Sequence, residues 1–197
     1  MLKVIINQIV TIVLCLAPGF ALAAEIEGVQ VADKMRVGDT ELVLNGAGVR
    51  TRVVFKVYVG ALYLPQKRAA PDAILSDAGA KRVALHMLRE ITPEQLFAAL
   101  NDGLKANHTP EQLAKIEPQA REFEGIFKKL PSAKSGDVIL LDYAPGAGTR
   151  VTVNGELKGT ISTVSAASGA EFYSALLRVW LGDKPAEASL KKAMLGG

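Results

Sequence analysis

The sequence contains little of what most metal sites and many catalytic sites are built from. Its 197 residues include one cysteine, Cys15, and two histidines, His86 and His108. A single cysteine cannot form an intrachain disulfide, and neither histidine has a cysteine or second histidine at zinc-ligand spacing. The chain also lacks a Gly-x-Ser-x-Gly elbow and a phosphate-binding loop. We therefore expect no metal, no cofactor and no catalytic residue of these familiar kinds.

Strong charge of one sign is also absent. The formal net charge is +3, and the basic residues are not clustered with aromatic residues between them. Domains that bind nucleic acid usually show such clusters, so we expect no nucleic-acid partner. Hydrophobic residues make up 49% of the chain, which is enough for a packed core. The length corresponds to a single globular domain behind a short leader.

The N-terminus has the pattern of a secretory signal peptide. Lys3 precedes an apolar run, and the small residues Ala21 and Ala23 fit the A-x-A cleavage rule. We predict that residues 1–23 are a cleaved signal peptide, with cleavage after Ala23 or Ala24. The protein would then be periplasmic or secreted.

Two other interpretations of the N-terminus are weaker. A membrane anchor would need about 20 uninterrupted apolar residues, and Pro18 and Gly19 break the run before that length. The chain could be a lipoprotein with its lipid attached to Cys15, but Leu14 stands where a lipoprotein signal would have a small residue. We therefore expect residues 24–197 to form the domain, with no membrane span after cleavage.

Strand and helix patterns are segregated along the domain. Strands are predicted at residues 41–48, 49–64, 81–88, 137–143, 150–153 and 156–161. Helices are predicted at 71–75, 93–105, 110–130 with a break at Pro118, 168–181 with Ser168 as N-cap, and from Pro185 to Gly196. This order indicates an α+β fold with an antiparallel sheet covered by helices on one face. A cleft between the two layers would be the natural place for a ligand.

The most informative segment runs from Leu44 to Pro65. Gly46-Ala47-Gly48 is expected to be a corner in the strand, and Arg50 follows it. A continuous strand over residues 49–64 would place on one face Arg50, Arg52, Val54, Lys56, Tyr58 and Leu62. Such a face could hold a carboxylate on an arginine and a hydrocarbon tail along the apolar positions. The same alternation is ordinary for a solvated antiparallel strand, and the pattern alone favours that interpretation.

Two motifs resemble the chalcone isomerase-like family. The first joins Asn-Gly-Ala-Gly-Val-Arg at 45–50 to Phe-Lys-Val-Tyr-Val-Gly-Ala-Leu-Tyr-Leu-Pro at 55–65. The second, Phe-Tyr-Ser-Ala-Leu-Leu-Arg-Val-Trp-Leu-Gly-Asp at 172–183, resembles the family's penultimate helix. The resemblance implies an open-faced β-sandwich, with a large antiparallel sheet, a helical layer on one face and a ligand cleft between them.

The resemblance also implies roles for particular residues. Arg50 matches the arginine that activates the substrate in the plant enzymes and that, with a tyrosine, holds the carboxylate in fatty-acid binders of the same fold. Tyr58 and Val179 stand where the enzymes have threonines, and Trp180 follows Val179. Asn107 is a candidate for a site amide in the 98–118 region, although it could equally be a helix C-cap.

These departures from the enzymes favour binding over catalysis. Valine cannot donate the hydrogen bond of a threonine, and losing one such donor can cost about a hundredfold in rate. We therefore expect a non-catalytic protein that binds a fatty acid or similar amphipathic carboxylate. The expected ligand-binding residues are Arg50, Tyr58, Leu62, Asn107, Val179 and Trp180.

Two alternatives remain open. One is an intramolecular lyase of the chalcone isomerase type acting on an unknown substrate. The other is an interaction protein whose cleft is filled by its own side chains, with Arg50 as a structural strut.

Overall fold

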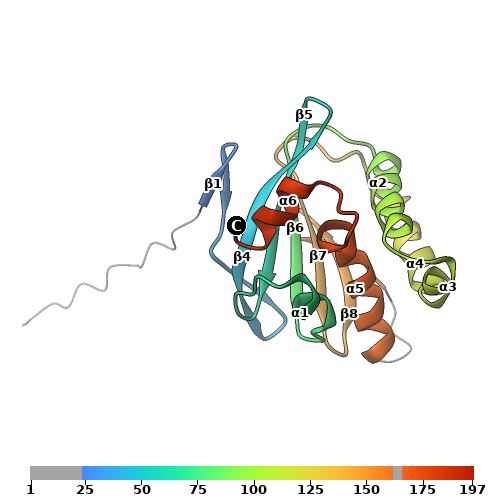
Figure 1. Cartoon of the computed structure of the whole chain (residues 1–197). Coiled ribbons are helices and arrows are strands. Elements are labelled where there is room, and N and C mark those ends of the chain that lie inside the picture. The colour runs from blue at the N-terminus through green and yellow to red at the C-terminus, as the bar shows by residue number, and fades with distance from the viewer. Residues whose placement is uncertain (1–23, 162–165) are drawn as a thin grey trace, which may run out of the picture.

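A seven-stranded antiparallel sheet forms the centre of the molecule (Figure 1). The computed structural model describes residues 24–161 and 166–197, and the predicted signal peptide lies outside them. The strands are β3 (Lys34–Val37), β4 (Thr40–Arg52), β5 (Phe55–Leu64), β6 (Lys81–Met87), β7 (Val138–Ala144), β8 (Gly148–Val153) and β9 (Glu156–Ile161). They lie in sequence order across the sheet, so each strand pairs with its neighbours along the chain.

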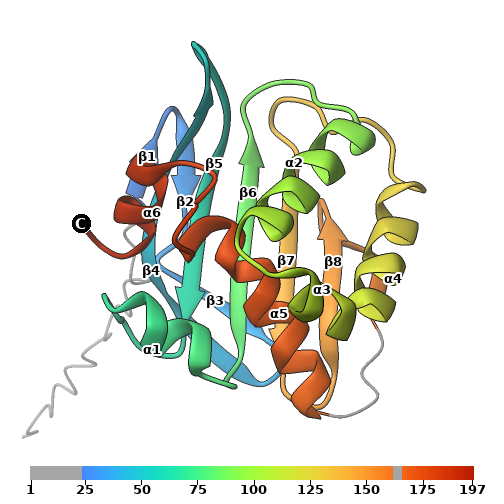
Figure 2. The same ribbon diagram turned by 45° about the vertical axis from the view of Figure 1, so that its right-hand side comes forward.

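The helices cover one face of this sheet, as Figure 2 shows. They are α1 (Pro71–Ser76), α2 (Pro93–Ala106), α3 (Pro110–Lys115), α4 (Glu117–Phe127), α5 (Ala166–Leu181) and α6 (Ala188–Met194). The other face packs against a small hairpin of β1 (Ala24–Ile26) and β2 (Val29–Val31). The predicted α+β fold, with helices on one face of a large antiparallel sheet, is confirmed.

Local sequence signals explain several of the helix ends. Thr92 and Thr109 each cap a helix with a complete capping box, to Gln95 and Gln112 respectively. Pro118 lies in the first turn of α4, so the predicted break separates α3 from α4. The expected cap at Ser168 is wrong, because α5 already begins at Ala166.

The long strand predicted over residues 49–64 is also wrong. The chain reverses at Val53-Val54, so this segment is the β4–β5 hairpin. Arg50 still pairs with Tyr58 across the hairpin and shares its face. A register shift next to this pair places Lys56 opposite Thr51 instead, so Lys56 lies on the other face. Two valines have high strand propensity, and nothing in their side chains signals a turn.

The Gly46-Ala47-Gly48 segment is not a corner but part of β4, beside a register shift between Leu44 and Gly46. Its glycines make room for α6. A methyl group at Gly46 would lie 2.0 Å from the Ala193 carbonyl oxygen, and one at Gly48 would lie 2.6 Å from the Ala193 side chain. The backbone of α6 therefore packs directly onto β4, as only glycine permits at these positions.

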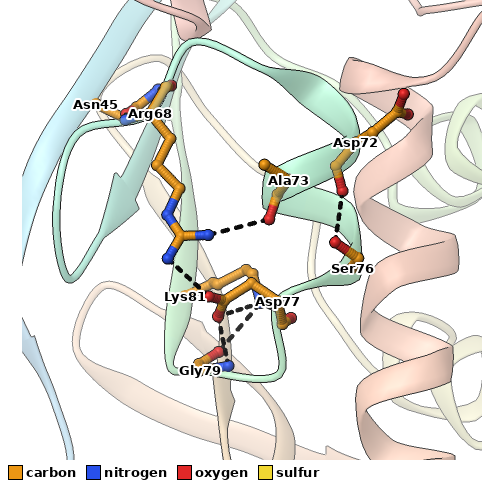
Figure 3. A network of polar contacts seen from close by, with 8 residues as sticks. All are labelled: Asn45, Arg68, Asp72, Ala73, Ser76, Asp77, Gly79 and Lys81. Carbon is orange, nitrogen blue, oxygen red and sulfur yellow. Dashed lines mark hydrogen bonds and ion pairs between the residues drawn. The ribbon is translucent and has the colours of Figure 1, made fainter.

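Asn45 fixes the end of α6 to the rest of the molecule. Its buried amide nitrogen donates to the carbonyl oxygens of Arg68 and Met194, at 2.9 and 2.8 Å, and its oxygen accepts from the Arg68 N–H. Figure 3 shows the Arg68 side chain continuing from there to Asp77, at 3.0 Å, where Lys81 and the Gly79 N–H also converge. Hydrogen bonds through Asn45 thus connect the loop before α1 to the C-terminal end of α6.

Candidate functional site

Four side chains converge where β4, β5, α5 and α6 meet. Arg50 and Tyr58 face the helices from paired positions of the hairpin. Trp180 approaches Tyr58 from α5, and Glu187 approaches Arg50 from the start of α6. We refer to Arg50, Tyr58, Trp180 and Glu187 as the Arg50 cluster.

Tyr58 is the buried member that touches the helix layer. Its hydroxyl oxygen accepts a hydrogen bond from Trp180 Nε1 at 3.0 Å. The ring extends over Gly60, where a methyl group would lie 3.3 Å from Tyr58 Cε2. Burial raises the pKa of Tyr58 to about 12, and this effect outweighs the opposing ones of Trp180 and Arg50. The phenol is therefore protonated at neutral pH, and among residues 24–161 and 166–197 we find no acceptor for its proton.

Glu187 places a carboxylate on Arg50. Its Oε2 lies 3.4 Å from Arg50 Nη1 and accepts the Thr51 N–H at 2.5 Å, while its Oε1 accepts the Ser189 hydroxyl at 2.8 Å. Glu187 is the N-cap residue of α6, yet its side chain makes no hydrogen bond that caps the helix. Burial alone would raise its pKa, but the donors Thr51, Ser189 and Arg50 outweigh burial, so the pKa of Glu187 lies below its ordinary value.

The other predicted site residues do not all join this cluster. Leu62 is buried in β5 on the helix-facing side, paired with Gly46. Val179 packs against α2, because a methyl group at Gly103 would lie 2.8 Å from Val179 Cγ1. The structure thus brings Arg50, Tyr58 and Trp180 together and leaves Val179 turned toward a neighbouring helix.

Asn107 has a structural position at the C-cap of α2. Its amide nitrogen donates to the carbonyl oxygens of Gly103 and Lys184, both at 2.8 Å, and its oxygen accepts the Lys184 N–H at 2.9 Å. Both groups of the side chain are therefore occupied in holding the segment between α5 and α6 against α2. Of the two roles that the sequence left open for Asn107, a site amide and a helix C-cap, the second describes its position.

The two best-formed hollows in the described part of the chain are lined by neither Arg50 nor Tyr58. The first, of about 160 Å³, lies between α2, the end of α4 and β7–β9, with Leu96, Phe127 and Lys158 in its wall. Pockets for drug-sized ligands usually measure about 300 to 1,000 Å³, so this hollow is small for one. The second is a wide surface hollow of about 280 Å³ beside Asn107.

Glu187 is the member of the cluster that the sequence does not reveal. An acidic residue at the start of a helix is ordinary, because the helix dipole favours negative charge there. Nothing local indicates that its side chain reaches an arginine 137 positions earlier in the chain. Within residues 24–161 and 166–197, no cluster of three potential metal ligands occurs, and no helix has the length and apolar character of a membrane span.

Comparison with known proteins assigns the chain to a family. Residues 23–196 match the family model described as chalcone isomerase-like. Among solved structures, the chain resembles a fatty-acid binding protein of Arabidopsis thaliana with a TM-score of 0.60 and 14% identity, over 85% of this chain and 92% of that one. At that identity the likeness is one of fold. No curated protein sequence matches significantly. With nearly the whole described chain matched by the family model, the protein belongs to the chalcone isomerase-like family.

Proposed function

We propose that the protein binds a small amphipathic carboxylate, such as a fatty acid, with Arg50 as the anchor of the carboxylate and Tyr58 as a second donor. One observation carries the proposal. Arg50 already binds a carboxylate, that of Glu187, beside a buried phenol whose proton has no acceptor among the described residues. A guanidinium matches a carboxylate in shape and charge, and partial burial strengthens the pair.

One comparison supports the proposed ligand, and one sequence pattern supports a proposed location. The Arabidopsis protein of the same fold is named as a fatty-acid binding protein. The N-terminal pattern of residues 1–23 is that of an export signal, so we propose that the protein acts in the periplasm or outside the cell. The proposed role is non-catalytic and uses no cofactor.

The Arg50 cluster gives this proposal a specific consequence. A ligand carboxylate would compete with Glu187, because both need the same guanidinium. The hydrocarbon tail of the ligand would have to separate β5 from α5. The buried side chains of Tyr58 and Trp180 lie between these elements, and neither of the two hollows is lined by Arg50. Binding should therefore be accompanied by movement of Glu187 away from Arg50, and Glu187→Gln should bind the ligand several-fold more tightly.

Trp180 provides a direct measurement, because it is the only tryptophan in the chain and contacts Tyr58. We expect palmitate to change the Trp180 fluorescence of the protein in a saturable way. Arg50→Ala should weaken binding at least tenfold, in the range of losing a charge-assisted hydrogen bond. Arg52→Ala is the matched control, because Arg52 lies in the same strand but is exposed. Equal binding by wild type and Arg50→Ala would contradict the proposal.

The interaction-protein alternative has its own supporting observation, since Tyr58 and Trp180 are buried beside Arg50 and Glu187 already occupies its guanidinium. Arg50 would then be a strut, and Arg50→Ala would lower the melting temperature without any ligand being involved. Native mass spectrometry of the purified protein, with solvent extraction, separates the two. A bound mass in the fatty-acid range, lost in Arg50→Ala, supports binding. A mass without any addition after incubation with excess fatty acid supports the strut, and chalcone turnover is assayed in parallel.

A further inference from the structure

The turn of the β4–β5 hairpin exposes three successive large apolar side chains. Val53 is 90% exposed, Val54 76% and Phe55 57%. Figure 2 shows the hairpin projecting beyond the neighbouring ends of the sheet. We call Val53, Val54 and Phe55 the apolar tip. Single exposed apolar residues are ordinary, but a contiguous group at a projecting point indicates an interaction surface.

The backbone of the apolar tip is unfavourable for the residues it carries. Val53 has a φ of +60°, a conformation that a β-branched residue rarely adopts. Two-residue hairpin turns normally place glycine, asparagine or aspartate at positive φ. The β8–β9 hairpin of this chain does so, with Asn154 at +50° and Gly155 at +82°. Because the β4–β5 turn keeps valines against this preference, its composition serves something other than the stability of the hairpin.

Basic side chains surround the apolar tip. Arg52 and Lys56 flank it in β4 and β5, and both are exposed. The guanidinium of Arg89, from the segment after β6, lies 4.7 Å from the centre of the Phe55 ring. Lys56 is paired with Glu27 at 2.6 Å, whereas Arg52 has no ion pair within the part of the chain that the structure describes.

Acidic groups near the tip offset only part of this charge. Besides Glu27, exposed Glu90 follows Arg89 in the chain. Three cations and two carboxylates leave the net charge around the apolar tip positive. We call Arg52, Lys56 and Arg89 the basic collar.

We propose that the apolar tip inserts into the interfacial region of an anionic phospholipid bilayer, with the basic collar at the level of the headgroup phosphates. Apolar side chains with flanking cations are the combination that binds peripheral proteins to anionic membranes. A protein partner fits the feature less well, because a stable protein interface buries about 800 Å² on each side, and a two-residue turn is narrow and convex. The proposal does not depend on whether Arg50 binds a ligand.

Vesicle co-sedimentation tests the proposal. We expect the protein to bind vesicles of equal parts phosphatidylcholine and phosphatidylglycerol at least about tenfold more tightly than vesicles of phosphatidylcholine alone, since each cation at the surface contributes. Binding should weaken as salt is raised. All comparisons use variants of the same full chain, so that the apolar run in residues 1–23 contributes equally to each. Amide hydrogen exchange adds a local readout, with protection expected at 52–56 on the anionic vesicles.

The decisive variant replaces the turn by one that hairpins prefer. Val53→Gly with Val54→Asn removes two apolar side chains and relieves the positive φ of Val53, so the melting temperature should be kept or raised. We expect this variant to bind anionic vesicles at least about tenfold more weakly. Leu157→Asn is the matched control, because Leu157 is 56% exposed in β9 and should leave binding unchanged.

Two outcomes would overturn the proposal. If the wild-type chain fails to bind vesicles of either composition, a lipid surface is not the partner, and a protein becomes the occupant of the tip to search for. If the Val53→Gly, Val54→Asn variant binds as tightly as wild type, the contact with lipid lies elsewhere on the chain.

Discussion

At the scale of single residues, Arg82 and Asp142 show how much a buried charge depends on its partner. They are paired across β6 and β7, on the face of the sheet that carries the β1–β2 hairpin. Arg82 donates two hydrogen bonds to Asp142, of 2.5 and 2.6 Å. Both side chains are almost fully buried. Asp142→Asn would leave the guanidinium buried without a counter-charge, which we expect to cost about 3–5 kcal/mol of unfolding free energy. Urea unfolding at neutral pH measures this loss.

An exposed pair provides the control for that prediction. Arg121 and Glu117 lie 2.5 Å apart on α4, but their side chains are 74% and 57% exposed. Glu117→Gln should change the unfolding free energy by less than about 0.5 kcal/mol, because solvent screens such pairs. Equal losses in the two variants would show that burial does not set the strength of the Arg82–Asp142 pair.

At the scale of elements, the contact between β4 and α6 depends on glycine. A methyl group at Gly46 would collide with the Ala193 carbonyl, which is backbone and cannot turn aside. We expect Gly46→Ala to cost about 1–3 kcal/mol and to speed amide exchange in α6. Because α6 carries Glu187, the same change should also loosen the Arg50–Glu187 pair.

Gly125 in α4 is the matched control for Gly46, because nothing lies within 4 Å of the place where its methyl group would be. Gly125→Ala should raise stability by up to about 1 kcal/mol, since alanine favours a helix over glycine. Thermal unfolding of both variants checks the opposite signs. Destabilisation by Gly125→Ala would mean that general effects of added methyl groups, not the contact with α6, explain Gly46→Ala.

At the scale of the whole molecule, stability should fall on acidification in two stages. Burial lowers the pKa of His86, whose Nε2 is buried without a hydrogen-bond partner. The unfolded chain therefore takes up this proton first, and stability declines as pH falls below about 6.5, the ordinary histidine value. His86→Gln should remove this first stage in a series of melting temperatures between pH 8 and 5.

The second stage comes from carboxylates. For Asp77, burial alone would raise the pKa, but the Gly79 N–H and the nearby Lys81 and Arg68 charges outweigh it, so its pKa is lowered. The pKa of Glu187 is lowered as well. A lowered carboxyl pKa contributes stability that is fully present above the ordinary value of about 4 and is lost as pH falls through the lowered value. We expect a steep drop in melting temperature below about pH 4; a flat curve there would contradict these assignments.

Much of this protein follows from short-range information in its sequence. Thr92 and Thr109 cap their helices because the cap and its partner lie three residues apart, and the Asn154-Gly155 turn follows from the backbone freedom of those two residues. The order of strands and helices predicts the α+β fold, because hydrophobic periodicity records which face of each element is buried. The Arg50 motif and the segment 172–183 predict the family.

How these parts meet depends on contacts between segments that are distant in the sequence. The turn at Val53-Val54 has no local signal, and a collision with the backbone of α6 explains Gly46 only once β4 and α6 are in contact. Glu187 reaches Arg50 across 137 positions of the chain, an encounter that depends on the packing of α6 onto the sheet. Local propensities act over a few residues, whereas such contacts depend on the whole fold; for that reason the sequence predicted the arginine but not the carboxylate that it holds.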